Sequence, residues 1–94
     1  MDLLYVEVLK PPEFHYARSG LEVCTFWACD PGQLENIRCV LFGTKAVGFA
    51  SDVVEGDLIY LAGEFKDRSW TGRDGTRHET TEFTVRRWSR EEFE

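Results

Sequence analysis

The sequence has few cysteines, and they do not form a metal-binding pattern. Cys24, Cys29 and Cys39 contain no C-x-x-C pair, and the only two histidines, His15 and His78, lie far from them in sequence. Structural zinc usually needs closely spaced pairs of ligands, so we expect no metal site and no cofactor. We expect reduced, mostly buried thiols. A disulfide between Cys24 and Cys39 stays open as an alternative if their strands are neighbours.

The sequence also lacks a long hydrophobic run. No stretch approaches the roughly 20 apolar residues that a membrane-spanning helix requires, so we expect no membrane role. The N-terminus, MDLLYV, has an acid but no basic region, and we therefore expect no signal peptide and a cytoplasmic location. A chain of 94 residues with 43% apolar and 30% charged residues has the composition of one globular domain, which oligomerisation would help to stabilise.

Positive charge is scarce and concentrated in one part of the chain. The net charge is −6, with 11 Lys and Arg against 17 Asp and Glu. Residues 1–63 carry a net charge of −5, residues 64–90 carry +2 and residues 91–94 carry −3. The local field matters more than net charge for a groove that follows phosphates. Residues 64–90 are therefore the candidate anion-binding region.

Residues 58–85 predict two long strands joined by a turn. In the first strand, apolar residues alternate with a set that mixes aromatic and charged side chains: Tyr60, Glu64, Lys66, Arg68 and Trp70. Because strand side chains alternate between faces, one face is apolar and the other presents aromatics and cations. Residues 71–76 are rich in turn formers, and residues 77–85 return with many β-branched side chains. We expect a protruding β-hairpin with Trp70 at the end of its first strand, next to the turn.

The rest of the chain predicts three earlier strands and one short helix. Strands are expected at residues 3–9, 21–29 and 36–42, whereas Pro11, Pro12 and the following residues bring the chain to a turn. Residues 45–54 predict a short helix that Thr44 caps and Gly56 ends. Gly63, inside a strand, predicts a bulge or a tight bend.

This order of elements predicts an all-β fold. It fits a five-stranded, partly open barrel of the OB type, with the helix between strands 3 and 4 and the hairpin protruding from it. We expect residues 1–90 to form this single domain and residues 91–94 to form a short acidic end.

Four stretches, in order, resemble the bacterial single-stranded DNA-binding protein (SSB) family. They are residues 12–20, PEFHYARSG; residues 37–43, IRCVLFG; residues 54–65, VEGDLIYLAGEF; and residues 68–85, RSWTGRDGTRHETTEFTV. Together they span nearly the whole chain. The resemblance implies a non-enzymatic protein that binds single-stranded DNA in replication, repair or recombination, as a dimer or tetramer associated with the nucleoid.

The resemblance also implies a set of site residues. Phe42 and Trp70 would stack on bases, with Trp27 as a third platform. Phosphate contacts would come from five cations: Arg38, Lys66, Arg68, Arg73 and Arg77. Stacking depends little on base identity, since every base has a π-face.

The sequence departs from the family pattern at several positions. Asn36 stands where many members have a tryptophan, and His15 replaces a usual arginine. The family's Gly- and Gln-rich linker and its acidic tip do not follow the barrel in this sequence. Residues 91–94 resemble that tip only weakly. We therefore keep open a shortened paralogue, a phage- or plasmid-type version, or a primosome-type relative.

Two other functions remain as alternatives. One is a primosome-type protein-interaction barrel with weak binding to single-stranded DNA, which the low positive charge favours. The other is RNA binding, because stacking does not distinguish the two sugars. The acids Glu79 and Glu82, and those near Gly56, are not accompanied by a nucleophile, a set of metal ligands or a phosphate-binding loop. We therefore expect that the chain is not an enzyme.

Overall fold

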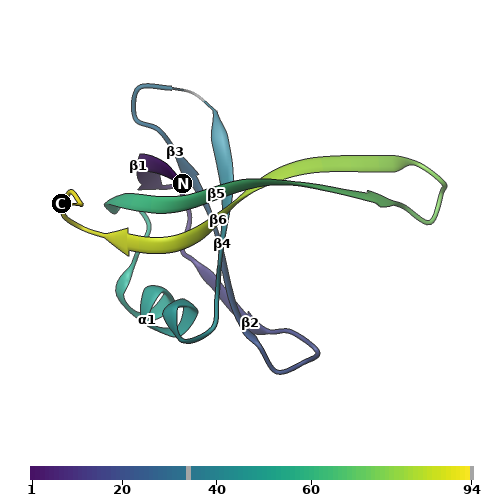
Figure 1. The fold of residues 1–94 in the computed structure, drawn as a ribbon, viewed down its shortest axis with the longest axis horizontal. Coiled ribbons are helices and arrows are strands. Elements are labelled where there is room, and N and C mark those ends of the chain that lie inside the picture. The colour runs from purple at the N-terminus through teal and green to yellow at the C-terminus, as the bar shows by residue number, and fades with distance from the viewer. Residues whose placement is uncertain (34, 94) are drawn as a thin grey trace.

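Five strands close into a barrel, as the sequence predicts. The computed structural model describes residues 1–33 and 35–93, so Glu94, the last residue of the predicted acidic end, lies outside the described residues. The barrel strands are β1 (Asp2–Val8), β3 (Glu22–Cys29), β4 (Asn36–Phe42), β5 (Leu58–Thr71) and β6 (Arg77–Ser89). Their order is β1, β5, β6, β4, β3, and pairing of β3 with β1 closes the ring. β4 and β6 pair in parallel. This is the predicted OB-type barrel (Figure 1).

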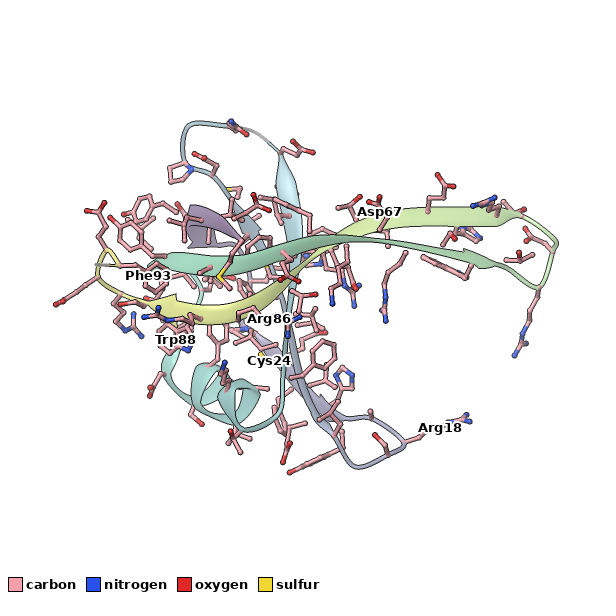
Figure 2. The ribbon with its side chains drawn as sticks, in the orientation of Figure 1. Arg18, Cys24, Asp67, Arg86, Trp88 and Phe93 are labelled. Carbon is pink, nitrogen blue, oxygen red and sulfur yellow. The ribbon has the colours of Figure 1, made fainter. Side chains whose placement is uncertain are left out.

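The sequence predicts only the approach to a turn after Pro12, and the short edge strand β2 (Glu13–Tyr16) found there corrects that prediction. It pairs antiparallel with β3, from Glu13 opposite Thr25 to Tyr16 opposite Glu22. All four of its residues are exposed, so it has no alternation of buried and exposed side chains to reveal it. The turn into β3 follows at Gly20, which has a φ of 86°. Arg18 projects from this turn away from the barrel (Figure 2).

The hairpin of β5 and β6 extends well beyond the barrel (Figure 1). The two strands pair from Tyr60 opposite Ser89 out to Thr71 opposite Arg77, and the register shifts at Ala62 and Gly63. This bulge confirms the prediction made from Gly63. A Cβ atom at that position would collide with the backbone carbonyl of Thr84, so the close approach of the two strands requires glycine there.

The helix α1 (Thr44–Asp52) lies between β4 and β5 and packs against β3 and β4 at one end of the barrel. Phe49 is fully buried, stacks on Phe26 at a centroid distance of 4.6 Å and meets the ring of Trp88 edge-on at 5.2 Å. The predicted cap at Thr44 is wrong. Gly43 is the N-cap residue, with a φ of 79°, and no side chain caps the helix. Packing of the aromatic rings therefore holds the helix in place.

The alternative of a disulfide between Cys24 and Cys39 is wrong. In the register of β3 and β4, Cys24 lies opposite Leu41 and Cys39 lies opposite Phe26, so the two cysteines are not partners. Both are free thiols in the core. Figure 2 labels Cys24. Within residues 1–33 and 35–93, no helix is long and apolar enough to cross a membrane.

Candidate nucleic-acid interface

A row of side chains crosses four strands on one face of the sheet. Trp27 on β3 lies opposite Arg38 on β4. Arg38 lies opposite Glu82 on β6, and Glu82 lies opposite Lys66 on β5. Directly opposed residues share a face, so an indole, a guanidinium, a carboxylate and an ammonium group follow one another across the sheet.

The hairpin continues this face outward from the barrel. Arg68 and Trp70 follow Lys66 on the same alternation of β5, and they lie opposite Thr80 and His78. The indole of Trp70 is 53% exposed and stacks on the imidazole of His78. Trp27, at the other end of the face, is 41% exposed. Two aromatic platforms therefore lie at the two ends of a polar, charged strip.

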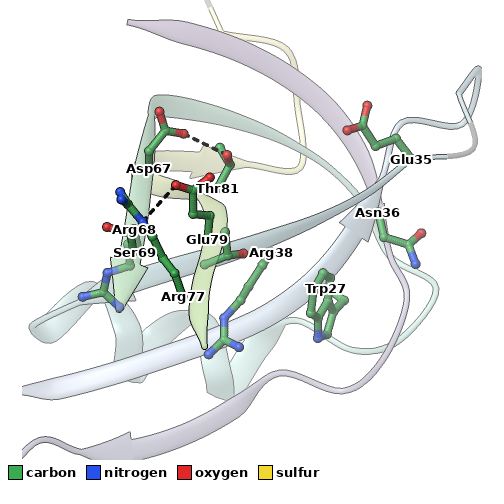
Figure 3. A pocket seen from close by; sticks show the side chains of 11 residues that line it. Trp27, Glu35, Asn36, Arg38, Asp67, Arg68, Ser69, Arg77, Glu79 and Thr81 are labelled. Carbon is green, nitrogen blue, oxygen red and sulfur yellow. Dashed lines mark hydrogen bonds and ion pairs between the residues drawn. The ribbon is translucent and has the colours of Figure 1, made fainter. Parts of the chain in front are cut away.

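Three adjoining hollows form a groove along this face, here called the Arg38 groove because Arg38 lines all three. The largest, about 660 Å³, holds Trp27 and also Arg68 and Arg77 from the hairpin (Figure 3). The second, about 450 Å³, is lined by Arg68, Trp70 and Glu82. The third, about 140 Å³, runs from Trp27 to Lys10. The groove therefore joins both tryptophans through a stretch of arginines.

The three arginines that line the Arg38 groove are each paired with a carboxylate. Arg38 Nε lies 2.9 Å from Glu82 Oε2, and Arg68 Nη1 lies 3.2 Å from Glu82 Oε1. Arg77 Nε lies 3.3 Å from Glu79 Oε1, where both side chains are well exposed. The Arg77–Glu79 ion pair is exposed to solvent and is therefore weak. The side chain of Glu82 is almost buried. The groove is therefore a mixed surface of cations and acids, and its positive excess is small.

Comparison with known proteins identifies the family of this chain. Residues 3–90 match the model of the Single-strand binding protein family. The chain belongs to this family. Members are non-enzymatic DNA-binding proteins, which agrees with the prediction that the chain is not an enzyme.

Relatives with this family name are similar over half of their length. A single-stranded DNA-binding protein of Lactiplantibacillus plantarum is 27% identical over an alignment 96 positions long, gaps included, which covers 93% of this chain and 48% of the relative. That of Bacillus cereus is 29% identical over 89 residues, covering 85% and 52%. The chain thus spans about half the length of the curated relatives it matches.

A solved structure supports the same fold. The SSB domain of a Synechococcus protein superposes with a TM-score of 0.77 at 22% identity, covering 93% of this chain and 90% of that one. This agreement confirms the predicted OB-type barrel, in which α1 lies between β4 and β5.

The SSB-type barrel brings together five of the eight predicted site residues. Trp27, Arg38, Arg68, Trp70 and Arg77 line the Arg38 groove. The other three lie outside its hollows. Lys66 shares the face beside Glu82, and exposed Phe42 continues the alternation of β4 beyond the groove, opposite Val23. Arg73 lies in the turn at the hairpin tip.

The turn that carries Arg73 is held by local hydrogen bonds. Gly72 N donates to Thr76 O at 2.8 Å, and Gly75 N donates to Gly72 O at 3.0 Å. The backbone N–H of Thr76 donates to Asp74 Oδ1 at 3.0 Å, and this bond, with the Thr76 side chain, lowers the pKa of the Asp74 carboxyl. Arg73 is thus presented on an ordered turn at the far end of the hairpin.

Sequence reasoning missed several groove residues. Among them are Lys10, Glu35, Asp67, Ser69 and Thr80, and Glu82 was considered in the sequence only as a possible catalytic acid. Thr80 and Glu82 share one alternation of β6, so pairing that strand with the cationic face of β5 in the correct register would have found them. Lys10 follows β1 and reaches the groove only through barrel closure. Among the described residues, no group of three or more His, Cys, Asp or Glu side chains is arranged to hold a metal ion.

Proposed function

We propose that this chain binds single-stranded DNA in the Arg38 groove with little preference for base sequence. The observation that carries the proposal is the groove itself, which places exposed Trp27 and Trp70 at the two ends of a strip containing Arg38 and Arg68. Each base stacked on an aromatic side chain contributes about 1–3 kcal/mol without regard to its identity. The names of the curated relatives support the same ligand.

Phosphates of the bound strand are contacted by the cations along the groove. Arg38, Arg68 and Arg77 line it, and Lys66 and Arg73 extend the same surface along β5 and its turn. Neutralising phosphates releases counterions, so affinity falls as salt rises. Phe42 offers a further stacking platform where β4 leaves the barrel face. The role would be in replication, repair or recombination, in association with the nucleoid.

We further propose that the chain acts as a homodimer or homotetramer. The outer face of β1 and β5 exposes Leu3, Tyr5 and Leu58, and Tyr5 packs on Tyr60 at a centroid distance of 4.6 Å. Burying these side chains between copies would stabilise a small domain. Several grooves in one assembly would let a strand wrap and gain avidity. Light scattering coupled to size exclusion tests this directly, since a monomer at micromolar concentration contradicts it.

A second candidate function is a primosome-type interaction module that binds single-stranded DNA weakly. The observation that favours it is the pairing of Arg38, Arg68 and Arg77 with carboxylates, because phosphates must compete with these acids. Strong complexes with replication or primosome proteins alongside weak, salt-sensitive DNA binding would support this candidate over the first.

A titration with oligo-dT tests the proposed function. Intrinsic tryptophan fluorescence is followed at two salt concentrations, because Trp27 and Trp70 both lie in the groove whereas Trp88 packs against α1. Strong quenching with an affinity that falls as salt rises is the expected result. Absence of quenching at low salt contradicts single-strand binding and directs the search to a protein partner. Oligo-rU in parallel tests RNA as the ligand.

A further inference from the structure

A single carboxylate holds two arginines that come from different strands. Glu82 on β6 has only 9% of its side chain exposed, and its two oxygens are used separately. Arg38 of β4 contacts Oε2 and Arg68 of β5 contacts Oε1. A carboxylate removed from water in this way is costly unless it is paired, so both contacts are strongly favoured. The two guanidinium groups are thereby fixed beside one another.

Each guanidinium keeps unused donors that reach the groove. A guanidinium has five N–H donors in a planar fork, whereas one carboxylate has about four lone-pair sites, so Glu82 cannot occupy all the donors of Arg38 and Arg68. Arg38 and Arg68 remain partly exposed and, with Trp70, line the same hollow of about 450 Å³. Two neighbouring guanidinium groups would otherwise repel each other, and the carboxylate between them offsets this repulsion.

The geometry points to a positioning role for Glu82 that rests on the proposed function. We propose that Glu82 orients Arg38 and Arg68 into one site for a single phosphodiester group of the strand, next to the base that stacks on Trp70. Arginine forks match phosphate oxygens in pairs, and side chains already fixed in place lose less freedom on binding. An acid in the middle of a DNA-binding groove thus strengthens binding through the cations it aligns.

Positioning by Glu82 and simple repulsion of DNA by its charge predict opposite effects of a Glu82 substitution on DNA affinity. If Glu82 only repelled DNA, then Glu82→Gln would tighten binding, and Glu82→Asp, which keeps the charge, would change nothing. If Glu82 positions the arginines, both substitutions weaken binding to oligo-dT by about tenfold. Gln removes the negative charge and replaces one oxygen with an NH2 group that repels a guanidinium, and Asp draws both oxygens back by one methylene. The matched control is Glu79→Gln, which removes the same charge from an exposed pair in the same groove.

The test compares these variants by fluorescence titration with oligo-dT over a range of salt concentrations. We expect Glu79→Gln to bind at least as tightly as the parent protein, and Glu82→Gln and Glu82→Asp to bind about tenfold more weakly. Adding Glu82→Gln to a variant that already carries Arg38→Gln and Arg68→Gln should cause no further loss, because the arginines it positions are gone. Thermal unfolding followed by circular dichroism checks that each variant folds.

Several outcomes would overturn the inference. Binding by Glu82→Gln as tight as that of Glu79→Gln, or an equal loss in the background without the two arginines, would show that Glu82 does not act through them. If Glu82→Gln does not fold, Glu82→Asp decides, since an unchanged affinity in that variant refutes the positioning role. A parent protein that does not bind oligo-dT removes the proposed function together with this inference. A parent that binds while the Glu82 variants bind equally well removes the inference alone.

Discussion

Trp70 and His78 stack across the hairpin, with ring centroids 5.3 Å apart and ring planes 19° from parallel. The two residues lie directly opposite one another on β5 and β6, so the imidazole covers one face of the indole. Trp70 is nevertheless 53% exposed, and it lines the groove. His78 therefore packs against one face of the Trp70 indole.

Replacing Trp70 with alanine should weaken binding to oligo-dT by about 1–3 kcal/mol, the contribution of one stacked base. The matched control is Tyr16→Ala, which removes an exposed aromatic ring from β2, outside the groove, and should leave affinity unchanged. Fluorescence anisotropy of a labelled oligonucleotide measures both variants. Equal affinity of Trp70→Ala and the parent protein would remove Trp70 from the site.

Replacing His78 with alanine should weaken binding less than loss of the platform itself. The indole remains available but loses its stacking partner, a contact worth about 0.5–1.5 kcal/mol to an aromatic pair. His78→Phe keeps a flat ring in the same place and should retain most of the affinity. The same anisotropy assay compares the two variants, and a His78→Phe variant as weak as His78→Ala would contradict a supporting role based on stacking.

Two glycine substitutions should change stability in opposite directions. Gly63→Ala places a Cβ against the Thr84 carbonyl at the bulge and should destabilise the fold by about 1–3 kcal/mol. Gly48→Ala lies inside α1, where nothing approaches within 4 Å of the new atom, and should stabilise by about 0.5–1 kcal/mol. Urea unfolding followed by tryptophan fluorescence gives both values. A Gly63→Ala variant as stable as the parent protein would refute the tight approach of β5 and β6.

The three thiols should differ in their reactivity. Burial raises the pKa of Cys24 to about 11 and that of Cys39 to about 12. The thiolate is the reactive form, so at pH 8 only about one molecule in a thousand carries it at Cys24, and fewer do at Cys39. Cys29 is partly exposed. We expect Ellman's reagent to modify one thiol in the native protein and three in urea. Rapid modification of all three under native conditions would contradict a closed barrel core.

Stability should depend on the ionisation of Asp57. The backbone N–H of Val54 donates to this carboxylate at 3.0 Å and Arg90 Nη1 also lies 3.0 Å away, and these bonds lower its pKa below the ordinary 3.8. The stabilisation is therefore complete above about pH 4 and is lost as pH falls through the lowered pKa.

Asp57→Asn tests this dependence, with exposed Glu55→Gln as the control. Urea midpoints should differ most between Asp57→Asn and the parent protein at pH 7, and the difference should shrink as the pH falls to about 3. The control should follow the parent at every pH. A difference that stays constant across this range would show that the charge of Asp57 does not matter.

The sequence predicted those features whose physical basis is local. Alternation of side chains and, in the return strand of the hairpin, β-branched residues identified the five barrel strands, and the turn residues and Gly63 placed the hairpin and its bulge. The edge strand β2 was missed, because it is held by backbone hydrogen bonds to β3 and buries no side chain. Thr44 was misjudged as a cap, since α1 depends on the packing of Phe49 rather than on its N-terminus.

The types of residue in the candidate site were evident from the sequence, but their arrangement was decided by the tertiary structure. Alternation tells which side chains share a face of one strand, and it says nothing of which strands become neighbours. Closure of the barrel pairs β4 with β6, and this long-range contact brings Arg38 to Glu82 and so to Arg68. The same closure joins Trp27 and Trp70 through one groove. Strand register between distant segments is a property of the whole sheet, so only the folded barrel determines which cations are paired and which platforms a strand can reach.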